Sequence, residues 1–243
     1  MAKNFLRKFE TKEIEKELEW RKHGKTSYPA NTVILLGPPG VGKATQCSII
    51  KETYGYCHIA SGQLLRYHID KGTQFGSRAK KYFGKGELVP DIIMNDIVKS
   101  ELNQPECQKG VVFEGYPKNM KQAEFLDGAL GSIGKKVDLI FKFGIEEEKL
   151  FERVEGRRVH APSGRSYHIK FNPPMNEGKD DLTGETLYKR PEDKKEIAHK
   201  KFQSFSKNVD NILQFYSKRD ITYDIDANPS IIYVWDQIQT HLI

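Results

Sequence analysis

A glycine-rich turn that joins a short apolar segment to a polar, helix-like segment constrains this chain most. Residues 32–36 read TVILL, which predicts a strand buried on both faces, and residues 37–45 read GPPGVGKAT. Glycines let backbone N–H groups curl around an anion, and a helix beginning near Gly42 adds its positive end. An ordinary glycine-rich turn is the alternative. Because Lys43 lies where it reaches β- and γ-phosphates, the pattern favours a nucleotide-phosphate site.

The turn departs by one position from the pattern G-x-x-x-x-G-K-[ST]. Ala44 occupies the place of the hydroxyl residue, and Thr45 follows it. A threonine hydroxyl is therefore still available to a metal ion, one residue later than the pattern requires.

Short apolar segments alternate with helix-length segments along the rest of the chain. The expected strands are 110–113, 139–143 and 221–225, and the expected helices are 4–25, 91–104, 119–130, 145–155, 191–218 and 229–242. This alternation predicts an α/β fold with a parallel sheet wrapped by helices. Two stretches interrupt it: 60–89 is polar and helical, and 156–190 is rich in glycine and proline. We expect both to be small inserted lobes, since long structureless loops are uncommon in compact domains.

The net charge of +6 is compatible with a polyanionic partner, but its distribution points elsewhere. Five of the ten arginines lie between residues 153 and 190, whereas the lysines are dispersed. No basic segment interleaved with aromatic residues indicates nucleic-acid binding, so no nucleic-acid partner is expected. No apolar run approaches the roughly 18 residues of a membrane span, and residues 1–20 lack the apolar core of a secretory signal. We expect no membrane partner.

The three cysteines, Cys47, Cys57 and Cys107, are odd in number and widely spaced, with no CxxC pair. They indicate neither a disulfide framework nor a zinc site. A reducing, intracellular compartment is the expectation, with the cytoplasm first and an organelle left open.

The glycine-rich turn resembles the GPPGxGKGTQ motif of adenylate kinases, and further motifs of that family follow in order. The matching segments are 37–46 (GPPGVGKATQ), 60–66 (ASGQLLR, for STGDLLR), 114–118 and 122–124 (EGYPK and QAE, for DGFPR and QAE), and 156–174 with 180–193 (for the lid of the long members). The resemblance covers residues 30–243, and residues 1–29 would be an N-terminal helical extension. Where zinc-binding relatives have lid cysteines, this chain has His160, Ser163, Asp180 and Thr183, which implies a metal-free, hydrogen-bonded lid.

The resemblance implies an activity and a division of the chain. It implies transfer of the γ-phosphoryl group of Mg²⁺-bound ATP to AMP, giving two ADP, in a fold of the P-loop NTPase type. The core would comprise residues 30–59, 90–155 and 194–243, the AMP-binding lobe residues 60–89, and the lid residues 156–193. ATP and AMP would be the substrates, Mg²⁺ the cofactor, and a monomer the usual state.

The resemblance also implies roles for residues. Those that neutralise the transferring group, and so would be catalytic, are Lys43, Lys118, Arg157, Arg190 and Lys201. Those that would bind ATP are Gly40, Val41, Gly42, Lys43, Ala44, Thr45, Arg153, Arg157, Ser166, Tyr167 and Pro229. Those that would bind AMP are Ser61, Arg66, Glu87, Leu88, Val89, Gly115, Tyr116, Pro117, Lys118, Gln122, Arg190 and Lys201. For Mg²⁺, Thr45 would be a direct ligand, and Gln63 and Glu114 would act through water.

Gln122 makes AMP the favoured acceptor, because its amide can both donate and accept hydrogen bonds at N1 and N6 of adenine. UMP and CMP are less favoured. The adenine of the donor would stack on the planar guanidinium of Arg153 and would not be read by hydrogen bonds. Both ATP and GTP therefore stay open as donors.

Four positions depart from the family's motifs. Lys118 and Lys201 replace arginines, and Gln63 and Glu114 replace aspartates. Lysine keeps the charge of arginine but loses its bidentate fork. One interpretation is an active kinase in which lysine is tolerated with a moderate loss of rate. The alternative is a catalytically attenuated member of the family that serves as a nucleotide-binding sensor or scaffold.

Overall fold

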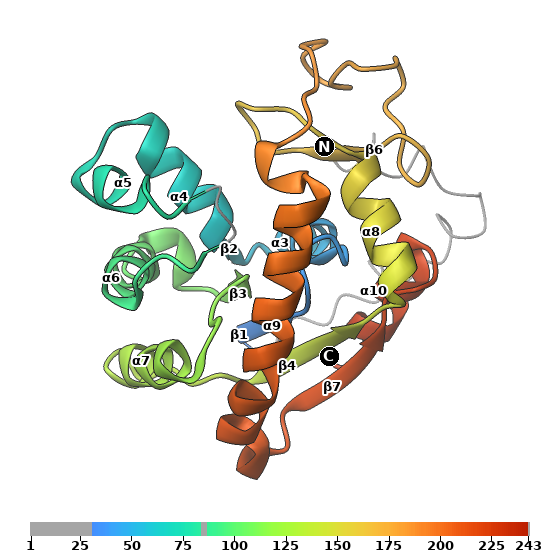
Figure 1. Ribbon diagram of the computed structural model, residues 1–243. Coiled ribbons are helices and arrows are strands. Elements are labelled where there is room, and N and C mark those ends of the chain that lie inside the picture. Colours follow the sequence, from blue (N-terminus) through green and yellow to red (C-terminus); the bar gives the residue numbers. More distant parts are fainter. Residues whose placement is uncertain (1–30, 84–86, 243) are drawn as a thin grey trace.

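The computed structural model describes residues 31–83 and 87–242 and has a five-stranded parallel sheet at its centre (Figure 1). The strands lie in the order β2 (Cys57–Ala60), β3 (Val111–Glu114), β1 (Thr32–Leu36), β4 (Leu139–Gly144) and β7 (Thr222–Asp226). The predicted α/β fold with a parallel sheet is confirmed. The hydrophobic pattern did not predict β2, because only the last two of its four residues are buried.

The central strands are buried on both faces, as their continuous apolar sequences indicate. All five residues of β1 are buried. Successive side chains of a strand point to opposite faces, so Ile34 and Leu36 join one apolar cluster while Val33 and Leu35 join the other.

Helices cover both faces of the sheet. Their bounds are α3 (Lys43–Tyr54), α6 (Asp91–Leu102), α7 (Met120–Gly131), α8 (Glu147–Gly156), α9 (Lys195–Tyr216) and α10 (Ile231–Gln239), with short 3₁₀ turns at η1 (Pro105–Cys107), η2 (Pro191–Asp193) and η3 (Ser217–Arg219). α6, α7 and α9 contribute to the first apolar cluster, and α3, α8 and α10 contribute to the second (Figure 1). Within the described ranges, none of these helices has the length and apolar character needed to cross a membrane.

The helix predicted over 191–218 begins only at Lys195. Arg190 is extended, with φ −65° and ψ 139°, as the residue before a proline prefers to be, and Pro191 then opens the separate turn η2. The helix expected over residues 4–25 lies outside the residues that the structure describes.

Two smaller parts lie beside the sheet (Figure 1). The first contains α4 (Ser61–Asp70) and α5 (Gln74–Ala79), with Thr73 capping α5 by accepting a 3.1 Å hydrogen bond from the Gly76 N–H. The second is residues 157–190, which include the antiparallel pair β5 (Arg157–Val159) and β6 (Ser166–His168).

A buried polar cluster organises residues 157–190. Asp180 accepts a 2.8 Å hydrogen bond from Nε of Arg165 and a 2.9 Å bond from the Thr183 N–H. The Arg165 guanidinium holds the pKa of Asp180 well below its usual range. His160 is buried, and its Nδ1 lies 2.7 Å from the Ser163 hydroxyl. The four residues that stand at the cysteine positions of zinc-binding relatives thus belong to one hydrogen-bonded cluster.

Cys57 and Cys107 are joined by a disulfide, which corrects the expectation drawn from their spacing. Cys57 begins β2, and its N–H donates a 2.9 Å hydrogen bond to the Gly110 carbonyl at the start of β3, shortly after Cys107. Parallel pairing therefore brings together two residues that are 50 positions apart in sequence. The expectation of a reducing compartment loses its support from the cysteines, while Cys47 is free and buried.

Candidate active site

A cavity of about 940 Å³ lies at the carboxyl ends of β1, β2 and β3, where open α/β sheets place their ligand sites. Its walls come from the glycine-rich turn, α4, α8, residues 157–190 and α9. Most of the residues that the sequence predicted for the site line this cavity. They are Gly40, Val41, Gly42, Lys43, Ala44, Thr45, Ser61, Gln63, Arg66, Glu87, Leu88, Glu114, Gly115, Pro117, Lys118, Arg153, Arg157, Ser166, Tyr167, Arg190, Lys201 and Pro229. Segments that are far apart in the sequence therefore meet at one site.

The glycine-rich turn presents backbone N–H groups to this cavity. Gly42 precedes α3 with φ 105°, a conformation that favours glycine, and no side chain caps the helix there. The first N–H groups of a helix have no partner within the helix and carry its positive partial charge. Lys43 Nζ donates 2.7 Å hydrogen bonds to the carbonyls of Gly37 and Pro38, which draws the turn around the ammonium group.

Three arginines, Arg66, Arg157 and Arg190, line the cavity and lie close enough to affect one another's charge. The Arg190 Nε is buried and has no hydrogen-bond partner among residues 31–83 and 87–242. Burial, followed by the positive charges of Arg66 and Arg157, lowers the pKa of Arg190. A buried guanidinium group facing two other cations is costly unless an anion completes the site. The arrangement therefore indicates a polyanionic ligand such as a chain of phosphates.

Two carboxylates partly balance these arginines. Arg66 NH1 lies 2.9 Å from the Glu192 carboxylate, and Arg157 Nε donates a 2.9 Å hydrogen bond to Asp193. Both acids belong to η2 and are buried. Glu192 lines the cavity but was not predicted as a site residue, although it directly follows the motif residues Arg190 and Pro191.

Burial also lowers the pKa values of the three lysines at the cavity. It brings the pKa of Lys43 to about 8 and the pKa of Lys201 to about 8. The pKa of Lys118 is lowered as well, because burial outweighs the attraction of Glu114. Each of these lysines loses its proton more readily than a lysine in water, and negative phosphates would stabilise the charged form.

Glu114, at the end of β3, is held by a neighbour that the sequence did not reveal. His58 Nε2 lies 3.0 Å from Glu114 Oε2. Burial would raise the pKa of Glu114, but the hydrogen bond and charge of His58, together with Lys43, keep that pKa below its usual value. The Cys47 thiol lies beside this pair, with ligand atoms of the three residues within 4.8 Å of one another. Burial raises the pKa of Cys47, so its thiol stays neutral.

The residues predicted to hold Mg²⁺ offer the oxygen ligands that this ion prefers. Thr45 lies in the first turn of α3, and Gln63 and Glu114 line the same cavity, each offering a side-chain oxygen. The donor set therefore fits a hydrated Mg²⁺ ion beside the glycine-rich turn.

A flat cationic surface lies at the other end of the cavity. The guanidinium carbon of Arg153 is 5.8 Å from the centre of the Phe171 ring, and its nitrogens lie 3.4 Å from the carbonyls of Val41, Asn228 and Pro229. Phe171 lines the cavity but was not predicted as a site residue, although it belongs to the segment that resembles the family's lid. A purine ring can stack on such a surface.

Three residues predicted to bind AMP do not line the cavity. Val89 packs in the first apolar cluster, and Tyr116 is buried with its hydroxyl 2.7 Å from Asn95 Oδ1. Gln122 is buried as well: its amide donates to Asp91 Oδ1 at 2.8 Å and accepts from the Lys118 N–H at 2.8 Å. Its hydrogen-bonding groups are thus already used within the protein.

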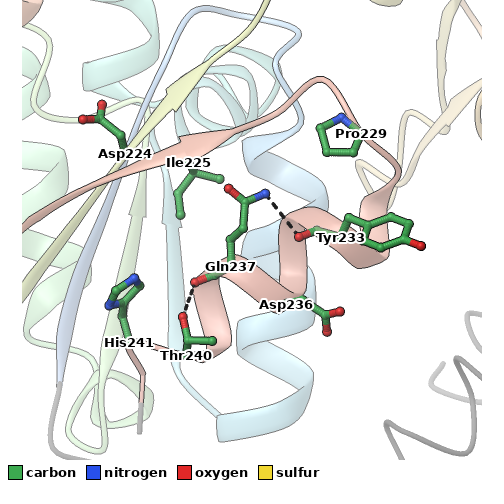
Figure 2. Close-up of a pocket in the computed structure, with 8 residues that line it drawn as sticks. All are labelled: Asp224, Ile225, Pro229, Tyr233, Asp236, Gln237, Thr240 and His241. Atoms are coloured by element: carbon green, nitrogen blue, oxygen red, sulfur yellow. Dashed lines mark hydrogen bonds between the residues drawn. The ribbon is translucent and has the colours of Figure 1, made fainter.

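Figure 2 shows a smaller and more open hollow of about 680 Å³ between β7 and α10. Two of its polar side chains bond to α10 itself: Gln237 Nε2 donates to the Tyr233 carbonyl at 3.2 Å, and the Thr240 hydroxyl donates to the Gln237 carbonyl at 2.7 Å. None of the clustered arginines lines it. Pro229 lines both hollows, but the larger cavity carries the cations.

The sequence is similar to those of known proteins over most of its length. Residues 35–221 match the family model described as adenylate kinase. The chain is 39% identical to an adenylate kinase of Archaeoglobus fulgidus, over 86% of this chain and 97% of that protein. It is 41% identical to adenylate kinase 4 of Oryza sativa subsp. japonica, over 83% of each, and 42% identical to an adenylate kinase of Kluyveromyces lactis, over 85% of this chain and 91% of that protein. The matched segment contains the glycine-rich turn, the clustered arginines and the three cavity lysines, and the chain belongs to the adenylate kinase family.

Proposed function

We propose that this chain transfers the γ-phosphoryl group of ATP to AMP and forms two ADP. The observation that carries this function is that Arg66, Arg157 and Arg190 line the same cavity as Lys43, with the buried Arg190 Nε lacking a partner within the described ranges. The names of the relatives support the same reaction.

The two substrates would enter from different ends of the cavity. ATP would stack its base on Arg153 and lay its phosphates along the glycine-rich turn, against Lys43 and the N-terminus of α3. AMP would enter beside α4, where Ser61 and Arg66 line the cavity. The transferring group would then lie between the two, within reach of the arginine cluster.

Phosphoryl transfer needs little covalent chemistry from the protein, because catalysis depends on alignment and on neutralising charge. Arg157, Arg190, Lys118 and Lys201 would surround the shared phosphoryl group. Lys43 would leave the carbonyls of the turn for the phosphates of ATP. When bound, Mg²⁺ would offset phosphate charge; Thr45 would be a direct ligand, and Gln63 and Glu114 would hold its water ligands.

We further propose that residues 60–89 form the AMP-binding lobe, residues 156–193 form the lid, and residues 30–59, 90–155 and 194–243 form the core. Both smaller parts contribute residues to the cavity, so their approach would exclude water from it. AMP would be the preferred acceptor if Gln122 exchanges its bonds to Asp91 and Lys118 for bonds to adenine.

We also propose that the protein acts as a monomer in the cytoplasm. A single chain supplies every cation of the proposed site, so no second copy is needed to complete it. Sedimentation should give a mass near 27.9 kDa, and imaging of the tagged full chain tests the compartment. A dimer whose dissociation abolishes turnover would refute the monomeric proposal.

A coupled assay of ADP formation with ATP, AMP and Mg²⁺ tests the function. We expect turnover with AMP, weak turnover with UMP or CMP, and none after Mg²⁺ is chelated. Lys43→Met should lower kcat/KM by about 10²–10³-fold or more, the size found when one transition-state donor is removed. Lys51→Met, at an exposed position of the same helix, is the matched control and should behave as wild type. Absence of ADP at millimolar substrates would refute the proposed function.

A further inference from the structure

His58 and Glu114 lie on neighbouring parallel strands, β2 and β3, of the central sheet. β2 and β3 run parallel, with His58 opposite Val112 and Ala60 opposite Glu114. Val112 and Glu114 lie two residues apart and so share one face of the sheet, which puts His58 diagonally beside Glu114 on that face. The contact between Nε2 and Oε2, at 3.0 Å, is the result. Only 9% of the His58 side chain and 22% of the Glu114 side chain are exposed.

We propose that His58 is a positioning residue that holds the Glu114 carboxylate in place for the water shell of Mg²⁺. Glu114 stands where the motif that this segment resembles has aspartate, and glutamate has one more rotatable bond. A longer, freer side chain must lose more conformational entropy before its carboxylate can orient a water molecule. The hydrogen bond from His58 fixes one carboxylate oxygen on the buried side and leaves the second oxygen available. If the chain transfers phosphoryl groups as proposed above, this arrangement supports that reaction.

The surroundings of the pair argue against two simpler interpretations. A purely apolar packing role would not require the imidazole nitrogen to face a carboxylate at hydrogen-bond distance. A soft-metal site made of Cys47, His58 and Glu114 would place a divalent cation close to the Lys43 ammonium, whose charge already acts on both Cys47 and Glu114. We therefore interpret the Glu114 carboxylate as a group that His58 holds in place and that acts at the phosphate-binding end of the cavity.

Variants of His58 separate positioning from packing. His58→Leu removes the donor, His58→Asn keeps polarity but is too short to reach, and His58→Gln puts an amide N–H at a reach close to that of Nε2. We expect His58→Leu and His58→Asn to lower kcat by about 10–100-fold, as for other residues that orient metal-shell groups, with KM for ATP and AMP within about threefold of wild type. His58→Gln should retain kcat within about threefold of wild type.

Two further measurements test the link between His58 and Glu114, and the second of them does not depend on turnover. In the Glu114→Asp background, where the side chain is shorter, His58→Asn should lower kcat by less than about threefold. Mn²⁺ can replace Mg²⁺ as a spectroscopic probe: titration of the ion into protein with ATP and no AMP, followed by electron paramagnetic resonance, should show Mn²⁺ affinity about tenfold weaker for His58→Asn and unchanged for His58→Gln.

The outcomes distinguish this inference from the proposed function. If wild type makes ADP but His58→Leu and His58→Asn keep wild-type kcat and Mn²⁺ affinity, His58 does not position Glu114. If His58→Gln loses as much as His58→Asn in both readouts, the imidazole has a packing role only, and the inference is overturned. If wild type makes no ADP, the proposed function fails, while the Mn²⁺ titrations still decide whether His58 orients the carboxylate. Should His58→Leu not fold, the comparison of the Asn and Gln variants decides.

Discussion

Replacing Lys201 by arginine should change the pH dependence of the reaction. Lys201 lies on α9 and lines the cavity, where burial lowers its pKa to about 8. A lysine is charged below its pKa, so Lys201 is a cation at neutral pH and loses its proton as the pH rises through about 8 in the free enzyme. Arginine stays protonated across this whole range.

The size of the effect follows from this pKa. One pH unit above its pKa, a group is about one-eleventh protonated, so the loss of charge at Lys201 should lower the rate of the free enzyme about tenfold near pH 9. The rate is therefore measured with both ATP and AMP well below their KM values, because bound phosphates would stabilise the charged lysine. Lys43 titrates in wild type and in Lys201→Arg alike, so the ratio of variant to wild type should rise about tenfold between pH 7 and pH 9.

The assay is initial-rate ADP formation at ATP and AMP concentrations well below their KM values, at constant ionic strength, between pH 6.5 and 9.5. Lys200→Arg is the matched control, because the neighbouring Lys200 is exposed and does not line the cavity. Its profile should follow that of wild type. If the profiles of wild type and Lys201→Arg superimpose, then Lys201 does not act through its charge, and its assignment to the transferring group is wrong.

Three further predictions concern charge and stability. The double variant Lys118→Arg, Lys201→Arg should change kcat at pH 7 by less than about tenfold, since arginine adds a bidentate fork but carries the same unit charge as a protonated lysine; a rise of several orders of magnitude would favour an attenuated wild type. Arg157→Met should lower the free energy of unfolding, measured by denaturant titration, by about 3–5 kcal/mol, because it leaves buried Asp193 without its partner. Arg219→Met is the control: it breaks a more exposed pair and should lower the free energy of unfolding by less than about 1 kcal/mol. Reducing the single disulfide should lower the free energy of unfolding by about 4 kcal/mol, as expected for a loop of its length, and a non-reducing peptide map without the cross-link would refute its presence.

The sequence was most informative where a local pattern has one physical meaning. An apolar strand, a glycine turn and Lys43 predicted a phosphate site, and alternating segments predicted a parallel sheet; both predictions follow from local patterns in the sequence. The carboxyl ends of parallel strands meet at one edge of a sheet, which brings together motifs that each follow a strand. The cavity lined by residues of all these motifs has that position.

Contacts between distant elements could not be predicted from the sequence. The disulfide, the pair of His58 with Glu114 and the ion pair of Arg66 with Glu192 each join residues at least 50 positions apart. Their formation depends on strand register and on where η2 ends, and neither is encoded in a local pattern. Gln122 shows another effect of distant contacts: its chemistry suits a purine, and in the structure its amide bonds to Asp91 and to the Lys118 N–H.

The positive charges that lie close together in the cavity help to explain why lysines can replace arginines there. Arg66 and Arg157 both repel Arg190, and Glu192, Asp193 and Glu114 partly balance these charges. An arginine cannot relieve this repulsion, because it does not lose its proton in proteins. Lys201, whose pKa is about 8, can lose its charge as the pH rises above about 8, and negative phosphates would favour its charged form. At neutral pH it keeps the charge that phosphoryl transfer requires, which favours a working enzyme over an attenuated one.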